Sequence, residues 1–376
     1  MRLDAVELRR IRLPLVAPFR TSHGVEDERD ILLMRVETSA GEGWGECVAG
    51  SDPLYSSEYV DAAEAVLRDH LLPRLFAAEL LGGQSVAEVL APVAGHRMAK
   101  AAIEMAVLDA ELRGRGQSFA SVLGAVRGAV DCGVSVGIQD SIPQLLDVVE
   151  RFLGHGYRRI KLKIEPGWDV EPVRAVRERF GDVLLQVDAN TAYTLADARH
   201  LARLDEFDLL LIEQPLPEEQ VLAHAALARQ LRTPVCLDES IVSAQAVADA
   251  IAQGACAIVN IKPGRVGGYL EARRIHDVCA AHGVPVWCGG MLESGLGRAG
   301  NVALAALPNF LLPGDTSASD RYFKEDITEP FVLRDGRLEV PSGPGLGVTP
   351  IPQVLESVTR RVDLVRSPDA ARPVLV

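Results

Sequence analysis

Short apolar runs recur through the middle of the chain at a nearly constant spacing, and each ends in a charged residue. The runs lie at 160–163, 184–188, 209–213, 235–238 and 257–262. The first four runs end 25 residues apart, and the fifth ends 24 residues later. A step of this length accommodates one strand, one helix and the loops that join them, so the pattern predicts repeated β/α units.

Further apolar runs extend this pattern to eight predicted strands. The additional runs lie at 133–137, 285–289 and 310–315. Amphipathic stretches such as 172–180 separate the runs, and nearly continuous apolar strands are typical of a parallel sheet that is covered on both faces. Eight such units predict an α/β fold with a (β/α)₈-type, TIM-like barrel rather than an open sheet. Pro308 and Pro313 interrupt the last unit.

The first third of the chain follows a different pattern. Alternating apolar positions over 6–13, 31–36 and 44–48 predict three antiparallel strands, with a loop at 18–24 after the first. Over 57–123 the apolar residues recur at helical spacing. This part of the chain is therefore predicted to be an α+β unit of three strands and several helices.

The end of the chain is predicted to return to this first unit. Apolar residues at 331–333 and 338–340 flank a turn and are typical of short strands. We therefore predict three parts: an N-terminal α+β capping domain over 1–125, a barrel of seven to eight β/α units over 126–322, and a C-terminal segment over 323–376 that returns to the capping domain.

Composition and charge exclude several classes of partner. The net charge is −13 without any Lys/Arg-rich run, which argues against nucleic acid or an anionic membrane surface. No apolar run approaches the roughly 20 residues of a membrane span. Residues 1–10 alternate charged and apolar positions, unlike a signal peptide, so a cytoplasmic protein is expected. The six cysteines form no Cys-x-x-Cys pair and are expected to be reduced.

Three of the charged strand ends are acids. Asp188, Glu213 and Asp238 come from successive strands, which lie about 4.8 Å apart in a sheet, so their side chains can meet. Clustered carboxylates repel each other unless a cation lies among them. Oxygen ligands of this kind suit Mg²⁺, with Mn²⁺ as a substitute. A single acid of this kind would be expected to cap a helix or pair with a lysine, but three at equal spacing favour a metal site.

The remaining strand ends carry lysines. Lys161 and Lys163 point to the same side of one strand, and Lys262 enters from the far side of the predicted barrel. An amine acts as a base only when it is neutral, and nearby positive charge is expected to lower the pKa of Lys163. The alternative is that the lysines, Lys161 above all, neutralise the acids in a structural network. A metal with two opposed bases suits removal of the α-proton of a carboxylate through an enediolate.

At this point the chain resembles a known family. The short motifs at 161–163, 188–190, 213–215, 238–240 and 260–262 are similar to those of the muconate-lactonising subgroup of the enolase superfamily. Longer motifs at 18–22, 43–47, 95–99, 289–295 and 312–316 resemble o-succinylbenzoate synthases of the N-succinylamino acid racemase type. The resemblance covers residues 1–350.

The resemblance implies roles for the charged residues. Lys163 and Lys262 would be the catalytic pair, with Lys161 in support, and the three acids would hold Mg²⁺, with Mn²⁺ or Co²⁺ as substitutes. In racemisation of an N-acylamino acid, Lys163 would take the α-proton and Lys262 would return one on the other face. In menaquinone biosynthesis, Lys163 would start the dehydration of 2-succinyl-6-hydroxy-2,4-cyclohexadiene-1-carboxylate while Lys262 stabilises the enolate.

The resemblance also implies how a small carboxylate substrate is held. Loops of the first domain would close over the barrel mouth, with Phe19, Thr21 and Ser22 and the loop at 51–55 as candidates. The residues expected to contact substrate are Phe19, Ser135, Asn190, Met291 and Phe323. A homo-oligomer, by family resemblance an octamer, is also expected.

Other functions stay open. The seventh run has no His, unlike mandelate-racemase-like relatives, and Asp315-Thr316-Ser317 lacks the Asp-x-Asp of dipeptide epimerases. A muconate cycloisomerase, or another racemase or epimerase of the superfamily, is an alternative. A barrel that only binds a ligand is an alternative of another class, although such a protein would have no use for intact metal and base sets. The sequence does not decide which reaction is physiological or which side chain is preferred.

Overall fold

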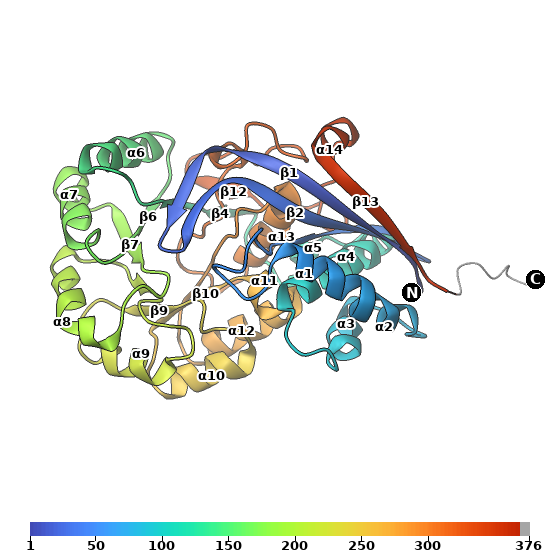
Figure 1. The fold of residues 1–376 in the computed structure, drawn as a ribbon, viewed down its shortest axis with the longest axis horizontal. Coiled ribbons are helices and arrows are strands. Elements are labelled where there is room, and N and C mark those ends of the chain that lie inside the picture. Colours follow the sequence, from blue (N-terminus) through green and yellow to red (C-terminus); the bar gives the residue numbers. More distant parts are fainter. Residues whose placement is uncertain (369–376) are drawn as a thin grey trace, which may run out of the picture.

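The computed structural model describes residues 1–368, and its larger part is a curled parallel sheet surrounded by helices (Figure 1). The sheet has seven strands in the order β11-β10-β9-β8-β7-β6-β5. Its strands are β5 (Gly133–Val136), β6 (Arg159–Lys163), β7 (Leu184–Asp188), β8 (Ile212–Glu213), β9 (Val235–Leu237), β10 (Ile258–Ile261) and β11 (Val286–Cys288). Neighbouring strands are parallel throughout, as the β/α pattern predicts.

Helices connect these strands and form the outer layer of the half-barrel. They are α6 (Ile142–Gly154), α7 (Val170–Phe180), α8 (Ala198–Leu201), α9 (Val221–Ala228), α10 (Ala244–Ala252), α11 (Pro263–Val266), α12 (Tyr269–Ala281) and α13 (Gly295–Ala305). Short 3₁₀ turns lie at Leu195–Asp197, Ala202–Phe207 and Ser319–Arg321. Figure 1 shows α6 to α10 following the outside of the sheet.

The predicted eighth strand at 310–315 is not formed. Instead this segment makes isolated contacts with both edges of the sheet: Asp315 N donates to Cys288 O (2.8 Å) beside β11, and Gly133 N donates to Gly314 O (2.7 Å) beside β5. Pro313 has no N–H to donate, which explains why a regular ladder does not form here. The α/β class is therefore confirmed, whereas the barrel has seven strands and one irregular connection.

The capping part contains a four-stranded antiparallel sheet in the order β13-β1-β2-β3. Its strands are β1 (Leu3–Thr21), β2 (Gly24–Thr38), β3 (Gly41–Cys47) and β13 (Thr359–Arg366). The loop expected at 18–24 is instead the end of a long hairpin, because Phe19 still pairs with Glu26 and Thr21 with Gly24. Figure 1 shows this hairpin reaching over the half-barrel.

The C-terminal part of the chain returns by a later strand than predicted. β12 (Arg337–Glu339) pairs with β4 (Ala129–Asp131) at the start of the half-barrel, and residues 331–333 form no strand. β13 makes the return, lying antiparallel to β1. The division into 1–125, 126–322 and 323–376 stays a prediction, and residues 369–376 of the last part lie outside the described residues.

Several helices complete the capping part. They are α1 (Val60–Val66), α2 (Leu72–Phe76), α3 (Gly83–Leu90), α4 (Arg97–Arg115), α5 (Phe119–Leu123) and α14 (Pro352–Val358), with a π-helical turn at Leu67–Leu71. α4 packs so closely on β3 that a Cβ atom added at Gly45 would lie 2.1 Å from Ala102 O. Within residues 1–368, no helix has the length and hydrophobicity of a membrane span. All six cysteines are free thiols, as predicted.

Two glutamates of the capping part bind the first turns of barrel helices. Glu104 of α4 accepts a hydrogen bond from Leu270 N (3.1 Å) in α12. Glu46 of β3 accepts from Ser294 N and Gly297 N (3.0 Å each) at the start of α13. A carboxylate is favourable at a helix N-terminus because the N–H groups there lack partners within the helix. These contacts fix the capping part against the half-barrel.

The Glu104 contact predicts a dependence of stability on pH. Burial raises the pKa of Glu104 from 4.5 to about 7. The folded chain therefore binds a proton more tightly than the unfolded chain, and this contribution to stability is lost as pH rises from about 4.5 through about 7. The free energy of unfolding of the wild type, relative to Glu104→Gln, is expected to fall by about 3 kcal/mol over that range.

Urea unfolding at several pH values measures this difference. Glu88→Gln, at an exposed position of α3, controls for the change of residue type. A wild-type stability relative to Glu104→Gln that stays constant with pH would contradict the prediction.

Candidate active site

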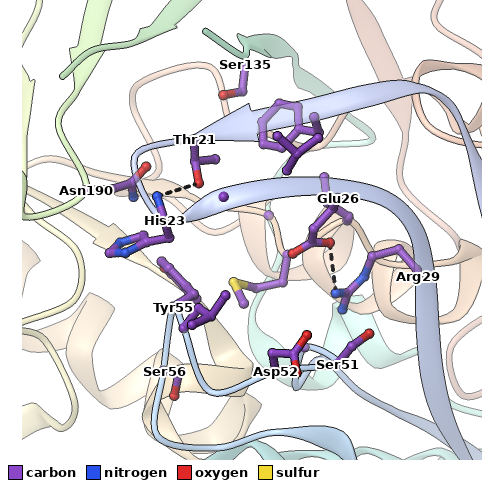
Figure 2. Close-up of a pocket in the computed structure, with 18 of the residues that line it drawn as sticks. Thr21, His23, Glu26, Arg29, Ser51, Asp52, Tyr55, Ser56, Ser135 and Asn190 are labelled. Carbon is purple, nitrogen blue, oxygen red and sulfur yellow. Dashed lines mark hydrogen bonds and ion pairs between the residues drawn. The ribbon is translucent and has the colours of Figure 1, made fainter.

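A cavity of about 340 Å³ lies at the carboxyl ends of the parallel strands, under the capping part. Lys161, Lys163 and Lys262 line it from the half-barrel. The β1–β2 hairpin contributes Thr21 and His23, and the loop before α1 contributes Ser51, Asp52, Tyr55 and Ser56 (Figure 2). The cavity is therefore enclosed jointly by strand ends and by two segments of the capping part.

The three strand-end acids are fully buried and close to ammonium groups. Asp188, Glu213 and Asp238 each have 0% relative exposure. Lys163 Nζ lies 2.6 Å from Asp188 Oδ2, and Lys262 Nζ lies 2.7 Å from Asp238 Oδ2. Lys161 Nζ lies 3.1 Å from Glu213 Oε2 and 3.2 Å from Asp188 Oδ2. The structure thus brings all six predicted metal and lysine residues together in one site.

Charge balance differs among the acids. Burial opposes ionisation of Asp188, but Lys163 and Lys161 outweigh it and hold its pKa below the usual range. Burial likewise opposes ionisation of Asp238, whose pKa is lowered by Arg265 and Lys262. The pKa of Glu213 is raised by burial and by the charge of Asp188. Glu213 is therefore the acid whose charge the described side chains compensate least.

The donor chemistry of this set fits a hard divalent cation. Carboxylate oxygens are the ligands that Mg²⁺ and Mn²⁺ prefer. Asp238 Oδ1 is buried and accepts no hydrogen bond, since Arg265 Nε at 3.3 Å is poorly aligned with it. In residues 1–368, no group of three or more His, Cys, Asp or Glu side chains is already spaced as a closed ligand set. The three acids have the donor type and the location that a divalent cation requires. In the structure, each of them contacts a lysine ammonium group.

Lys161 belongs to a buried ionic network that the sequence does not predict. Asp315 Oδ2 lies 2.7 Å from Lys161 Nζ, and Asp315 Oδ1 accepts from Arg159 Nη1 (2.9 Å). Both cations also lie over the ring of Trp287, at 4.8 Å and 5.1 Å from its centroid. Asp315 ends the predicted eighth strand and lies in one of the family-like motifs, but no local pattern indicates its pairing with Lys161 and Arg159. Lys161 therefore lines the cavity and also neutralises acids.

The two outer lysines have different neighbours. Lys163 Nζ donates to Asn190 Oδ1 (2.5 Å), whose amide donates to Glu239 Oε1 (2.9 Å). Lys262 Nζ donates to the hydroxyl of Tyr55 (2.8 Å), a residue of the predicted closing loop. Burial opposes the charge of Lys262, but Asp238 outweighs it and raises its pKa above the usual range. The contact between Tyr55 and Lys262 spans 207 residues of sequence, so no local pattern indicates it.

Four of the five predicted substrate-contact residues line the cavity. These are Phe19, Ser135, Asn190 and Met291. Phe323 does not line the cavity: it is 2% exposed and packs in the core, while its neighbour Tyr322 lines the cavity. Tyr322 was missed because adjacent aromatic residues outside a regular element do not reveal which one faces the site. Ser22, from the predicted closing segment, donates to Asn190 O (3.3 Å).

The backbone is strained where it leaves the strands at this site. Asn190 and Thr191 after β7 have φ of 40° and 68°, Gln214 after β8 has 36°, and Leu292 in the segment after β11 has 56°. Positive φ is uncommon for residues other than glycine and costs about 1–3 kcal/mol each. Such strain gathers at functional sites, where the surrounding structure holds it.

Comparison with known proteins adds family relationships to this geometry. Residues 144–354 match the family model described as enolase C-terminal domain-like, and residues 5–124 match the mandelate racemase/muconate lactonizing enzyme N-terminal domain. An N-succinylamino acid racemase from Amycolatopsis sp. is 72% identical over 96% of this chain and 98% of its own. An o-succinylbenzoate synthase from Geobacillus kaustophilus is 48% identical over 92% of each chain.

A solved structure shares this fold, and a more distant relative has a lower sequence identity. A member of the enolase superfamily from Listeria innocua superposes with a TM-score of 0.94 at 40% identity, covering 98% of this chain and 100% of that one. A muconate cycloisomerase from Rhodococcus opacus is 28% identical over 92% of this chain and 95% of its own. The similarity to racemase and synthase sequences is thus much higher than the similarity to the cycloisomerase.

The network around Asp315 yields a stability prediction. Asp315→Asn is expected to lower the free energy of unfolding by roughly 3 kcal/mol, because the buried charges of Lys161 and Arg159 lose a carboxylate partner. Urea unfolding measures the loss.

Asp131→Asn is the matched control. Asp131 also pairs with two arginines, at 3.3 Å and 2.8 Å, but its side chain is 42% exposed. Water screens exposed pairs, so this change is expected to cost at most about 1 kcal/mol. Equal losses in the two variants would contradict the assigned difference.

Proposed function

Because the chain belongs to the mandelate racemase/muconate lactonizing enzyme family of the enolase superfamily, we propose that it removes the α-proton of small carboxylate substrates. Its activities are N-succinylamino acid racemisation and o-succinylbenzoate synthesis, the functions named for its relatives. Both reactions pass through an enediolate, so one set of residues can serve both.

The observation that carries this proposal is the placement of two lysines about one carboxylate set. Lys163 ends β6 and Lys262 follows β10, with the strands of the three acids between them in the sheet order. Both lysines line the same cavity. A substrate whose carboxylate binds at the acids would present its α-carbon to an amine on either side. Such an arrangement supports removal of a proton from one face and delivery to the other.

Enolase superfamily members generally use a divalent metal. We propose Mg²⁺, with Mn²⁺ or Co²⁺ as substitutes, held by Asp188, Glu213 and Asp238. When bound, such an ion stabilises the negative charge that develops on the carboxylate oxygens of the substrate. Lys161, held by Asp315, keeps a positive charge beside Asp188 and Glu213 and so helps to balance the carboxylate set.

The lysines divide the work differently in the two reactions. In racemisation, neutral Lys163 accepts the α-proton and Lys262, as an ammonium group, donates a proton to the opposite face; the roles reverse for the other enantiomer. In synthesis of o-succinylbenzoate, Lys163 accepts the proton and returns it to the departing hydroxide, which leaves as water. Lys262 then remains an ammonium group and stabilises the enolate electrostatically, which agrees with the raised pKa that Asp238 gives it.

The two alternative functions have less support than racemisation and o-succinylbenzoate synthesis. Muconate cycloisomerase activity has the support of distant relatives only, such as the 28% identical enzyme from Rhodococcus opacus. A barrel that only binds a ligand would gain nothing from three buried acids matched by three lysines around a cavity. A cytoplasmic location and assembly into a homo-oligomer stay predictions of the sequence.

Removal of each lysine tests the division of roles. Lys163→Ala is expected to lower both activities by roughly 10²–10⁴-fold, because synthesis begins with proton transfer to this amine and racemisation needs it as acceptor or donor on one face. Lys262→Ala is expected to lower racemisation by a similar factor and synthesis by less, since synthesis needs no second proton transfer. Polarimetry and ultraviolet absorbance of the aromatic product measure the two rates.

Lys324→Ala, at an exposed lysine outside the cavity, is the control for loss of positive charge. Retention of either activity in Lys163→Ala would exclude Lys163 as the base.

The metal assignment is tested by stability rather than by activity. At about 100 times its Kd, Mg²⁺ is expected to stabilise the wild type by about 3 kcal/mol, because it binds only the folded chain. Glu213→Gln is expected to lose this stabilisation. Without metal the variant should be no less stable than the wild type, since the lost carboxylate is buried beside Asp188.

Thermal unfolding with and without Mg²⁺ or Mn²⁺ measures both effects. Glu219→Gln, at an exposed position in the loop that follows β8, is the matched control. An unchanged response to metal in Glu213→Gln would remove Glu213 from the ligand set.

A further inference from the structure

The two lysines of the cavity are held by different parts of the molecule. Lys163 Nζ bonds to Asp188 and Asn190, which lie at the end of β7 and directly after it. Lys262 Nζ bonds to Asp238 of the half-barrel and to Tyr55 of the capping part. The direct partners of Lys163 thus belong to the half-barrel, and the capping part reaches them through Ser22, which donates to Asn190 O. Lys262 instead bonds directly to Tyr55 of the capping loop.

Tyr55 is well placed to fix Lys262. Its hydroxyl oxygen accepts hydrogen bonds from Lys262 and from Arg265, and its own hydrogen is directed to Asp238 Oδ2 at 3.5 Å. Lys262 Nζ also lies 5.2 Å from the centroid of the Tyr55 ring, within the range of a cation–π contact. The hydroxyl oxygen is therefore the main contact between the phenol group and the amine.

The ring of Tyr55 is itself braced by the hairpin of the capping part. His23, at the turn between β1 and β2, lies edge-on to it with a centroid distance of 5.6 Å. Figure 2 shows His23 and Tyr55 approaching each other from the hairpin and from the loop. Both residues line the cavity, so the hairpin supports the ring whose hydroxyl contacts Lys262.

We propose that Tyr55 is a positioning residue for Lys262 and that it makes proton transfer on the Lys262 face depend on the capping loop, while transfer on the Lys163 face does not. This inference rests on the proposed function and deepens it. Without the hydroxyl, Lys262 keeps Asp238 as its partner and loses the contact that directs its amine from the side of the cavity. Racemisation needs both faces and suffers, whereas synthesis of o-succinylbenzoate begins at Lys163 and suffers less.

Exchange of the α-proton with deuterated solvent measures each face separately. The two enantiomers of an N-succinylamino acid present their α-protons to opposite lysines, and Lys262→Ala identifies the enantiomer that depends on Lys262 as the one whose exchange it abolishes. In Tyr55→Phe, the exchange rate of that enantiomer is expected to fall about tenfold or more, the usual effect of losing a hydrogen bond to a charged group. The exchange rate of the other enantiomer is expected to stay within about twofold of the wild type.

Tyr59→Phe is the matched control. It makes the same change four residues later, at a hydroxyl with no hydrogen-bond partner among residues 1–368. Phenylalanine keeps the ring at position 55, so the contact with His23 and the fold are retained, and the thermal midpoint verifies this.

The possible outcomes separate the inference from the proposed function. Equal losses for both enantiomers would show that Tyr55 only supports the site or the metal ligands, and would overturn the inference. Unchanged exchange for both would overturn it too. If the wild type exchanged neither enantiomer with Mg²⁺ present, the proposed function would fail, and with it the inference.

Discussion

The structure depends above all on compensating three carboxylates that are buried at neighbouring strand ends. Asp188, Glu213 and Asp238 have no contact with water, and like charges so placed would raise one another's pKa values. Lys161, Lys163 and Lys262 supply matching charge from the same end of the sheet. The lysines that can transfer protons are therefore the groups that make the acid cluster tolerable. The same lysine side chains therefore stabilise the buried acids and are available for proton transfer.

A second constraint is that the capping part must have a defined position over the cavity. The half-barrel provides the charged residues of the cavity, and the capping part provides the hairpin and loop that enclose it. The capping part is fixed on the half-barrel by Glu46 and Glu104, which bind the first turns of α13 and α12. The N-terminus of α13 follows directly on the segment that carries Met291 into the cavity. Docking of the two parts and shaping of the site are thus physically linked.

The periodicity of the sequence was sufficient to predict the β/α units, the parallel order of the strands and the residues of the acid and lysine cluster. This succeeded because a strand end is a local feature, and parallel strands carry local features to one shared edge. The eighth strand was wrong because Pro313 lacks the backbone donor that a ladder needs, although the segment still links both edges. The core position of Phe323 and the ion pairs of Asp315 could not be predicted, because they depend on packing between segments far apart in sequence.

The unequal support of the two lysines bears on how one site can serve two reactions. The direct partners of Lys163 lie in the half-barrel, so we expect its function to survive changes in the loop that carries Tyr55. Lys262 shares Tyr55 with a loop, and loops accept substitution more readily than the strands that they cover. Changes in the capping loop can therefore alter racemisation without altering the proton abstraction that begins both reactions. On this view, the balance between racemase and synthase activities is set at the contact between the capping part and one lysine, rather than among the metal ligands.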